Sequence, residues 1–137
     1  MSCGAHHTAM VTVSKQLFVM GSNSRAQLGL GDPREILRCT IPTLVQSLAH
    51  LHVIKVECGA NHTLSIAKDI IGARGTHVYA WGDNSRGQTG TSEADMVISP
   101  HKIHFQNSSQ GGEIFSADKI SAGKEHTFFL DLKSWQV

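Results

Sequence analysis

A thirteen-residue block occurs twice in this chain and limits what the chain can fold into. The first copy spans residues 17–29 and the second spans residues 78–90. Both contain Gly-x-Asn-Ser-Arg-x-Gln-x-Gly, and equivalent positions lie 61 residues apart. A block that recurs at such a period is typical of a repeat protein, in which each unit packs against its neighbours. We therefore expect a repeat array.

A second motif, Gly-x-x-His-Thr followed by apolar residues, occurs three times. Its copies begin at Gly4, Gly59 and Gly123, at intervals of 55 and 64 residues. We attribute the longer second unit to a long hairpin loop over Asp69–Gly75 and a longer connection over Ser108–Gly112. Periods of this length favour propeller blades over helical solenoids.

The apolar runs are short, rich in β-branched and aromatic residues, and bounded by turn formers, which predicts strands. Leu44, Val45, Leu48 and Leu51 have helical spacing within Thr43–His52. The matching segment 103–113 has no such spacing and contains two glycines, so we interpret both segments as strand and loop. The predicted strands are Thr8–Val13, Leu17–Met20, Val53–Val56, Thr63–Ala67, His77–Trp81, Lys102–Phe105, Lys119–Ser121 and Thr127–Leu132.

Most of the repeated residues are predicted to support the backbone. Glycine permits tight turns and close approach of a neighbouring chain. The repeated asparagine amides can bond nearby backbone in Asx-type turns, and the glutamine amides can satisfy backbone groups across the loop. The predicted structural positions are Gly4, His7, Gly21, Asn23, Gln27, Gly29, Gly59, His62, Trp81, Gly82, Asn84, Gly87, Gln88, Gly90, Gly123 and His126.

The three repeated histidines could in principle form a metal or catalytic site. Each of His7, His62 and His126 occupies the same place in its unit, however, and convergence would need symmetry about an axis that so few units cannot supply. We expect each to hydrogen-bond within its own blade. The pairs His50/His52 and His101/His104 have no cysteine or carboxylate partner at zinc-site spacing, so we do not expect them to bind metal.

The sequence contains none of the common motifs for covalent chemistry. There is no phosphate-binding Gly-Lys-Ser/Thr, no Gly-x-Ser-x-Gly and no His-Glu-x-x-His. Three cysteines without a close pair suggest reduced thiols, and the place of Cys3 and Cys58 is taken by Ala122 in the third copy, which suggests that a small apolar side chain suffices there. We predict no catalytic residue, no cofactor and no metal.

Charge and hydropathy argue against two further classes of partner. The formal net charge is +1, which provides no basic surface for a phosphate backbone. No apolar run approaches the roughly 20 residues that span a bilayer, and the N-terminus lacks the pattern of a signal peptide. We expect an intracellular protein, cytoplasmic or nuclear, without membrane insertion and without direct binding of nucleic acid.

Together these motifs resemble the regulator of chromosome condensation repeat over essentially the whole chain. The resemblance implies an all-β partial propeller built from four-stranded antiparallel blades. It divides the chain into a first repeat that starts mid-blade (1–57), a second (58–121) and the start of a third (122–137). Two departures are local: Ala26 stands where the second copy has Gly87, and Thr89 where the first has Leu28. Because a positive φ strains alanine, we expect a different loop backbone at Ala26.

The resemblance implies a seven-bladed ring, which needs about three times this length of chain. We expect a fragment of a longer propeller, or closure by association, because open blades leave unpaired edges. We predict a non-catalytic protein-interaction module. The family's founding member is an exchange factor for the small GTPase Ran and binds nucleosomes, so exchange activity on a Ran-like GTPase is the alternative, and chromatin is a weaker hypothesis. The candidate partner-binding residues lie on the two loops: Ser24, Arg25, Asp83, Ser85 and Arg86.

Overall fold

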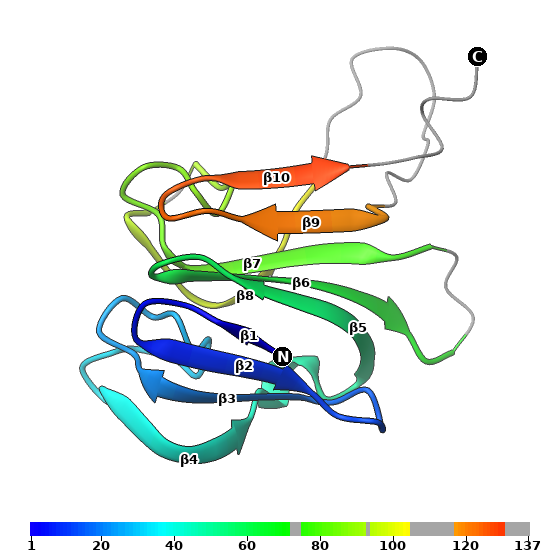
Figure 1. Ribbon diagram of the computed structural model, residues 1–137, viewed down its shortest axis with the longest axis horizontal. Coiled ribbons are helices and arrows are strands. Elements are labelled where there is room, and N and C mark those ends of the chain that lie inside the picture. Colours follow the sequence, from blue (N-terminus) through cyan, green and yellow to red (C-terminus); the bar gives the residue numbers. More distant parts are fainter. Residues whose placement is uncertain (72–74, 93, 105–116, 131–137) are drawn as a thin grey trace.

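Three antiparallel β-sheets lie one above another in the computed structural model of the chain (Figure 1). The structure describes residues 1–71, 75–92, 94–104 and 117–130. Apart from one short 3₁₀-helix, η1 (Gln46–Leu48), the regular structure of these residues consists of strands. The three sheets confirm the all-β prediction.

The first sheet has the order β1-β2-β3-β4, with every neighbouring pair antiparallel. Its strands are β1 (Ser2–Cys3), β2 (His7–Val11), β3 (Leu17–Ser22) and β4 (Arg38–Leu44). The last strand contains Pro42, which has no N–H to offer to a further strand. Pro42 therefore limits β4 as a template for unwanted pairing.

The second sheet repeats this arrangement in the order β5-β6-β7-β8. Its strands are β5 (Leu51–Cys58), β6 (His62–Asp69), β7 (His77–Asp83) and β8 (Met96–Lys102). A proline, Pro100, again lies in the last strand. Two consecutive four-stranded antiparallel sheets are the blades that the sequence predicts.

The third sheet consists, in the described part of the chain, of β9 (Lys119–Ala122) and β10 (Thr127–Leu130). Each Gly-x-x-His-Thr motif lies at the turn between the first two strands of a sheet. The predicted repeat boundary between residues 57 and 58 falls at the end of β5, which pairs with β6. The repeat limits remain a prediction, whereas the pairing assigns all of β5 to the second sheet.

The strand predictions need several corrections. The last strand of the second sheet is β8 (Met96–Lys102), not Lys102–Phe105, because β7 pairs with residues before Ile103. Strands β1 and β4 are absent from the predicted set. The segment Thr43–His52 includes the end of β4, η1 and the start of β5, so its helical spacing corresponds to one short turn. Phe105, Asp131–Leu132, Ser108–Gly112 and part of Asp69–Gly75 lie outside the described residues.

The same irregularity interrupts both four-stranded sheets. The register between β3 and β4 shifts between Val19 and Gly21, and that between β7 and β8 shifts between Ala80 and Gly82. Both glycines have positive φ, 112° and 105°. A Cβ on Gly82 would lie 2.7 Å from the Cα of His62, so only glycine lets β7 pass this close to β6.

The hydrophobic core is divided into two layers, one between each pair of adjacent sheets. Between the first and second sheets, Ala9 and Val19 pack with Val53, Val56 and Trp81. Between the second and third sheets, the buried residues include Leu64, Ile66, Val78, Ala80 and Ile120. Each sheet therefore depends on its neighbour for burial, as expected for a repeat array.

Candidate protein-interaction surface and the contacts that hold it

The repeated loops after β3 and β7 have the same internal hydrogen bonds. Asn23 accepts the Leu28 N–H at 3.0 Å and donates to the Ile36 carbonyl at 2.7 Å. Gln27 Oε1 accepts the Arg25 N–H at 2.8 Å. These bonds go to backbone groups of the loop, which is the role that we expect for the asparagine and glutamine amides.

The second loop reproduces this network residue for residue. Asn84 accepts the Thr89 N–H at 3.1 Å and donates to the Ala94 carbonyl at 2.8 Å. Gln88 Oε1 accepts the Arg86 N–H at 2.8 Å. The two buried amides in each loop fix the backbone on which the outer side chains stand.

Four of the five candidate partner-binding residues are exposed: Ser24, Arg25, Ser85 and Arg86. Asp83 is half-buried, and its Oδ1 accepts the Ser85 N–H at 3.2 Å. Ser22 has the equivalent place in the first loop and accepts the Ser24 N–H at 3.3 Å. Asp83 therefore supports the turn as well as bordering the exposed surface.

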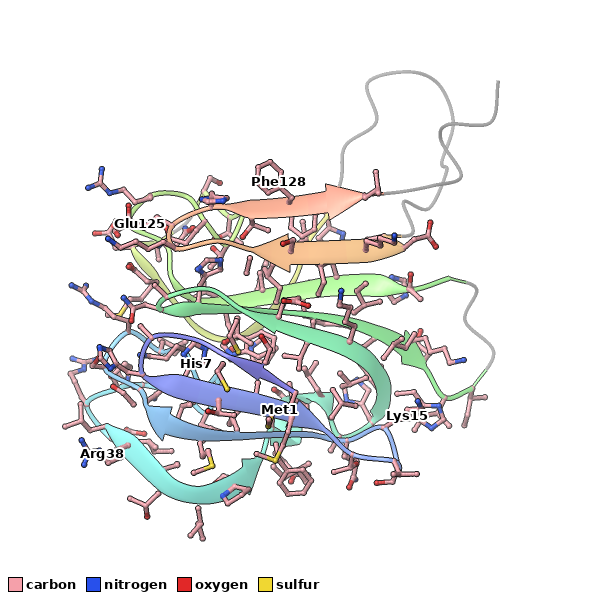
Figure 2. All side chains as sticks on the ribbon, viewed as in Figure 1. Met1, His7, Lys15, Arg38, Glu125 and Phe128 are labelled. Carbon is pink, nitrogen blue, oxygen red and sulfur yellow. The ribbon has the colours of Figure 1, made fainter. Side chains whose placement is uncertain are left out.

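The loops share one edge of the molecule with the turns that carry the Gly-x-x-His-Thr motifs (Figure 1). Figure 2 shows Arg38 and Glu125 at this edge and Lys15 at the opposite edge. Exposed side chains from successive sheets are thus presented side by side, on backbones that the buried amides hold in place.

An apolar groove of about 750 Å³ borders the first loop, and sequence reasoning missed it. It runs between the β3–β4 loop and the start of β8, where Leu37 is 64% exposed and Ile98 is 45% exposed. The Gly31 N–H donates to the Ile98 carbonyl at 3.1 Å and joins the two walls. Its apolar walls at Leu37 and Ile98 lie outside the repeated block, so no repeated pattern marked the groove. Its lining residues are Ser24, Asp32, Pro33, Arg34, Leu37, Ala94, Asp95, Met96 and Ile98.

A three-residue hydrogen-bond relay joins the first sheet to the second. Thr63 Oγ1 donates to the Gln27 carbonyl at 2.7 Å, which uses its only proton. His7 Nε2 lies 2.8 Å from Thr63 Oγ1. Because the Thr63 proton is already used, His7 is the donor in this bond. Trp81 Nε1 also donates to the Gln27 carbonyl, at 3.0 Å. All four residues are buried.

The same relay joins the second sheet to the third. Thr127 Oγ1 donates to the Gln88 carbonyl at 2.7 Å, and His62 Nε2 donates to Thr127 Oγ1 at 3.0 Å. The expectation that the repeated histidines bond within their own blades is wrong for His7 and His62. His7 and His62 each bond the threonine of the next sheet. Sequence reasoning assigned no role to Thr63 and Thr127, although a threonine follows the histidine in all three motifs.

Burial keeps His7 neutral. Desolvation, together with smaller contributions from the nearby His62 and His6, lowers the pKa of His7 from 6.5 to about 4. The pKa of His62 is also lowered, chiefly by burial. The Nδ1 atoms of both rings are buried without a hydrogen-bond partner among the described residues, so a second proton there would have no acceptor.

The turns that carry the motifs also contact one another. The Ala5 N–H donates to the Ala60 carbonyl at 3.1 Å, and the Ala60 N–H donates to the Lys124 carbonyl at 3.3 Å. A Cβ on Gly59 would lie 2.6 Å from the Gly123 carbonyl oxygen and would overlap the His62 ring. The motif therefore requires glycine for contact between sheets as well as for the turn.

The loop backbone at Ala26 contradicts the prediction made from its sequence. Ala26 has φ 59° and Gly87 has φ 73°, so the two loops share the left-handed conformation. Ala26 is fully buried, and its N–H donates to the Asn23 carbonyl at 2.9 Å. The surrounding network holds alanine in a conformation that it rarely adopts.

The described residues include no group of three or more His, Cys, Asp or Glu side chains placed to hold a metal ion. No helix among them is long and apolar enough to cross a membrane. Cys58 is buried and free, and desolvation raises the pKa of its thiol to about 11, which disfavours the reactive thiolate.

Comparison with family models decides the relationship. The model described as the regulator of chromosome condensation (RCC1) repeat matches residues 15–66 and 77–130, and a second RCC1 repeat model matches residues 53–88. The chain belongs to the RCC1 repeat family. The RCC1 matches include both Asn/Gln loops and, apart from His7, the residues of both inter-sheet relays.

The chain spans less than a quarter of the length of each curated relative described below. The chain is 33% identical over 133 residues to the Xenopus laevis protein RCC2 homolog, covering 96% of this chain and 23% of that protein. It is 32% identical over 133 residues to the human probable E3 ubiquitin-protein ligase HERC6, of which it covers 12%. It is 40% identical over 105 residues to the mouse X-linked retinitis pigmentosa GTPase regulator, covering 77% of this chain and 10% of that protein.

Solved structures confirm the propeller-type fold. Human WBSCR16 superimposes with a TM-score of 0.77 at 20% identity, covering 96% of this chain and 30% of that structure. Prp20p from Saccharomyces cerevisiae, a structure described together with its binding to Gsp1p and histones, superimposes with a TM-score of 0.71 at 16% identity, covering 96% of this chain and 31% of that structure. At these identities the likeness supports the fold alone.

Proposed function

We propose that this chain is a non-catalytic protein-interaction module that binds its partner through the edge formed by the loops after β3 and β7. One observation carries the proposal: each loop places an exposed Ser-Arg pair on a backbone that buried Asn and Gln side chains hold rigid. A rigid backbone lowers the entropy lost when exposed side chains are ordered by a partner. Arginine is also enriched in protein interfaces.

The apolar groove beside Ser24 gives the same edge a hydrophobic contact. Interfaces combine a buried apolar centre with a polar rim. Leu37, Met96 and Ile98 would supply the centre, and Ser24 with Asp95 would lie at the rim. The partner surface that fits this edge has an apolar projection flanked by carboxylates that pair with the loop arginines.

The test compares two charge-reversed chains with the wild type. In Arg25→Glu/Arg86→Glu both loop arginines change sign, whereas Lys15→Glu reverses one charge at the opposite edge. The candidate partners are the proteins that bind to the wild type and to Lys15→Glu but do not bind to the double variant. A purified candidate is then titrated against all three chains. We expect the double variant to weaken binding at least tenfold and the control to leave it unchanged. If the double variant binds as tightly as the wild type, the partner surface lies elsewhere.

The second hypothesis is guanine-nucleotide exchange on a Ran-like small GTPase, in which a loop would loosen the bound nucleotide. It is favoured by one curated relative that is named as a GTPase regulator. The assay is release of a fluorescent nucleotide from Ran- and Rab-type GTPases with and without the chain. Faster release that Arg25→Glu/Arg86→Glu abolishes supports exchange through these loops. Unchanged nucleotide release from every GTPase opposes the exchange hypothesis. The interaction-module proposal is tested separately, by the charge-reversed chains.

A further inference from the structure

The apolar groove lies between the two four-stranded sheets, and hydrogen bonds hold both of its walls in place. One wall is the β3–β4 loop of the first sheet, and the other is the start of β8 in the second. The Asn23 N–H donates to the Leu37 carbonyl at 2.8 Å, and the Asn84 N–H donates to the Asp95 carbonyl at 2.8 Å. Because the buried asparagines fix both walls, the groove is formed before a ligand binds.

The first wall is also held by a pair of opposite charges. Arg34 Nε donates to Asp32 Oδ2 at 3.0 Å, and the Arg34 N–H donates to Asp32 Oδ1 at 2.8 Å. The Asp32 carbonyl accepts the N–H groups of Glu35 and Ile36, each at 3.0 Å. Hydrogen bonds from Arg34 lower the pKa of Asp32 from 3.8 to about 2, so its carboxylate stays ionised at neutral pH. The charges of Asp32 and Arg34 therefore balance each other.

Asp95 is the charge of the second wall, and it has no such counterion. Its side chain is exposed, and no lysine or arginine among the described residues forms an ion pair with it. Asp83 is the cross-strand partner of Met96, so a second carboxylate lies beside this wall. The β8 side of the groove therefore attracts a cation.

The side chains of the groove differ between the two repeats, whereas the asparagines that hold its walls are the same. The pairing of β3 with β4 and of β7 with β8 makes Met96 equivalent to Arg38, and Asp95 equivalent to Leu37. The fold therefore does not require a particular side chain at these places, which leaves them free to select a ligand.

The shape of the groove favours a segment of polypeptide over a small molecule. Small-molecule sites bury most of the surface of their ligand. Both apolar walls of this groove are open to solvent instead, since Leu37 is 64% exposed and Ile98 is 45% exposed. An extended segment places alternate side chains on one side. Two apolar side chains of such a segment can cover both walls while its backbone stays in water, and the burial is favourable.

We propose that the groove binds an extended segment of a partner protein in which two apolar side chains are followed by a lysine or arginine. The apolar side chains cover Leu37, Met96 and Ile98, and the cation pairs with Asp95. The assignment rests on the proposed function, because the groove belongs to the same edge, and it adds the chemistry that selects the partner. Exposed ion pairs contribute little affinity, so Asp95 selects basic over acidic segments while the apolar walls supply most of the binding.

Three peptides with uncharged ends serve as probes: Leu-Ser-Leu-Ser-Lys, the same peptide with glutamate in place of lysine, and Ala-Ser-Ala-Ser-Lys. Each is titrated to millimolar concentration into the isotope-labelled wild-type chain, and the amide NMR shifts locate the binding. We expect the leucine–lysine peptide to shift the amides of Leu37, Met96 and Ile98. It should bind roughly three- to tenfold more tightly than the glutamate peptide. The alanine peptide should leave these amides unmoved.

Three variants separate the charge from the apolar walls. Asp95→Lys should reverse the preference, so that the glutamate peptide binds more tightly than the lysine peptide. Glu125→Lys makes the same change of charge at an exposed residue of the same edge, on the third sheet, and should keep the wild-type preference. Ile98→Ser should weaken the binding of both leucine peptides alike. The NMR spectrum establishes that each variant is folded. Asp95→Asn, which should remove the preference, and Leu37→Ser replace any that is not.

Three results overturn the proposal: a leucine–lysine peptide that leaves the groove amides unmoved, an alanine peptide that shifts them equally, or a preference that Asp95→Lys leaves unchanged. None of them bears on the loop arginines, because the lysine peptides carry no carboxylate. The Arg25→Glu/Arg86→Glu chain, which tests the proposed function, should bind the leucine–lysine peptide at least as tightly as the wild type. The groove and the loop arginines can therefore fail separately.

Discussion

His7 Nε2 lies 2.8 Å from Thr63 Oγ1, across the interface between the first two sheets and 56 residues further along the chain. Thr63 Oγ1 in turn donates a hydrogen bond to the Gln27 carbonyl. The three residues therefore form a chain of hydrogen bonds that runs in one direction, from His7 through Thr63 to Gln27. Equivalent atoms of His62, Thr127 and Gln88 repeat the arrangement. The relay explains why the motif pairs histidine with threonine.

Replacing Thr63 with valine should destabilise the chain, because it leaves the His7 Nε2–H buried without an acceptor. An unsatisfied buried polar group costs about 1–3 kcal/mol. Thr8→Val is the matched control, since the Thr8 hydroxyl makes only an exposed contact with Cys3 Sγ at 3.6 Å. Chemical denaturation of dilute protein measures both. An equal free energy of unfolding for the two variants would show that the relay adds nothing.

Acid should destabilise the chain through His7. The folded-state pKa of about 4 lies below the unfolded value of 6.5, so between these values the unfolded chain binds more protons. Neutral His7 contributes about 3 kcal/mol to the free energy of unfolding. This contribution is fully present above pH 6.5 and is lost as the pH falls towards 4. The lowered pKa of His62 acts in the same direction.

The difference between the wild type and His7→Gln isolates this effect. Denaturation curves collected from pH 7 to pH 4 should show a smaller loss of stability in the variant, because only the other groups still titrate. Parallel losses in the two proteins over this range would contradict the role assigned to His7.

Two glycines at equivalent loop positions should respond differently to alanine. Gly29 and Gly90 have φ 68° and 73°, so alanine at either one adopts a left-handed backbone, at a cost of roughly 1–2 kcal/mol. A Cβ on Gly29 would also lie 2.7 Å from Trp81 Nε1, whereas the nearest atom to a Cβ on Gly90 is Ile103 Cδ1 at 3.8 Å. We expect Gly29→Ala to cost about 1–3 kcal/mol more than Gly90→Ala. Thermal unfolding measures the difference, and equal melting temperatures would oppose the close contact with Trp81.

The repeat pattern was sufficient to predict features that are complete within one unit. The Asn23 and Gln27 amides bond their own loop, so their residue types and their recurrence at Asn84 and Gln88 indicate the role. The partner of His7 could not be predicted in this way, because a repeat shows that His7 and His62 have equivalent surroundings without showing whether a partner belongs to the same unit or to the next.

Other errors have local causes. Met96–Lys102 contains a proline and lacks clear alternation, so the sequence did not mark β8 at its actual position. Ala26 takes a positive φ because the hydrogen bonds of Asn23 and Gln27 outweigh the intrinsic preference of alanine. The groove at Leu37 and Ile98 joins residues from two repeats outside the repeated block, and only the packing of the sheets brings them together.

The central claim is that the relay couples adjacent sheets, and a double-mutant cycle between His7 and Thr63 tests it most directly. The free energy of unfolding is measured for the wild type, His7→Leu, Thr63→Val and the double variant, with His7→Leu and Thr127→Val as a cycle between residues that share no contact. We predict a coupling of about 1–2 kcal/mol for His7 with Thr63 and additivity for His7 with Thr127. Additive effects in both cycles would contradict the account.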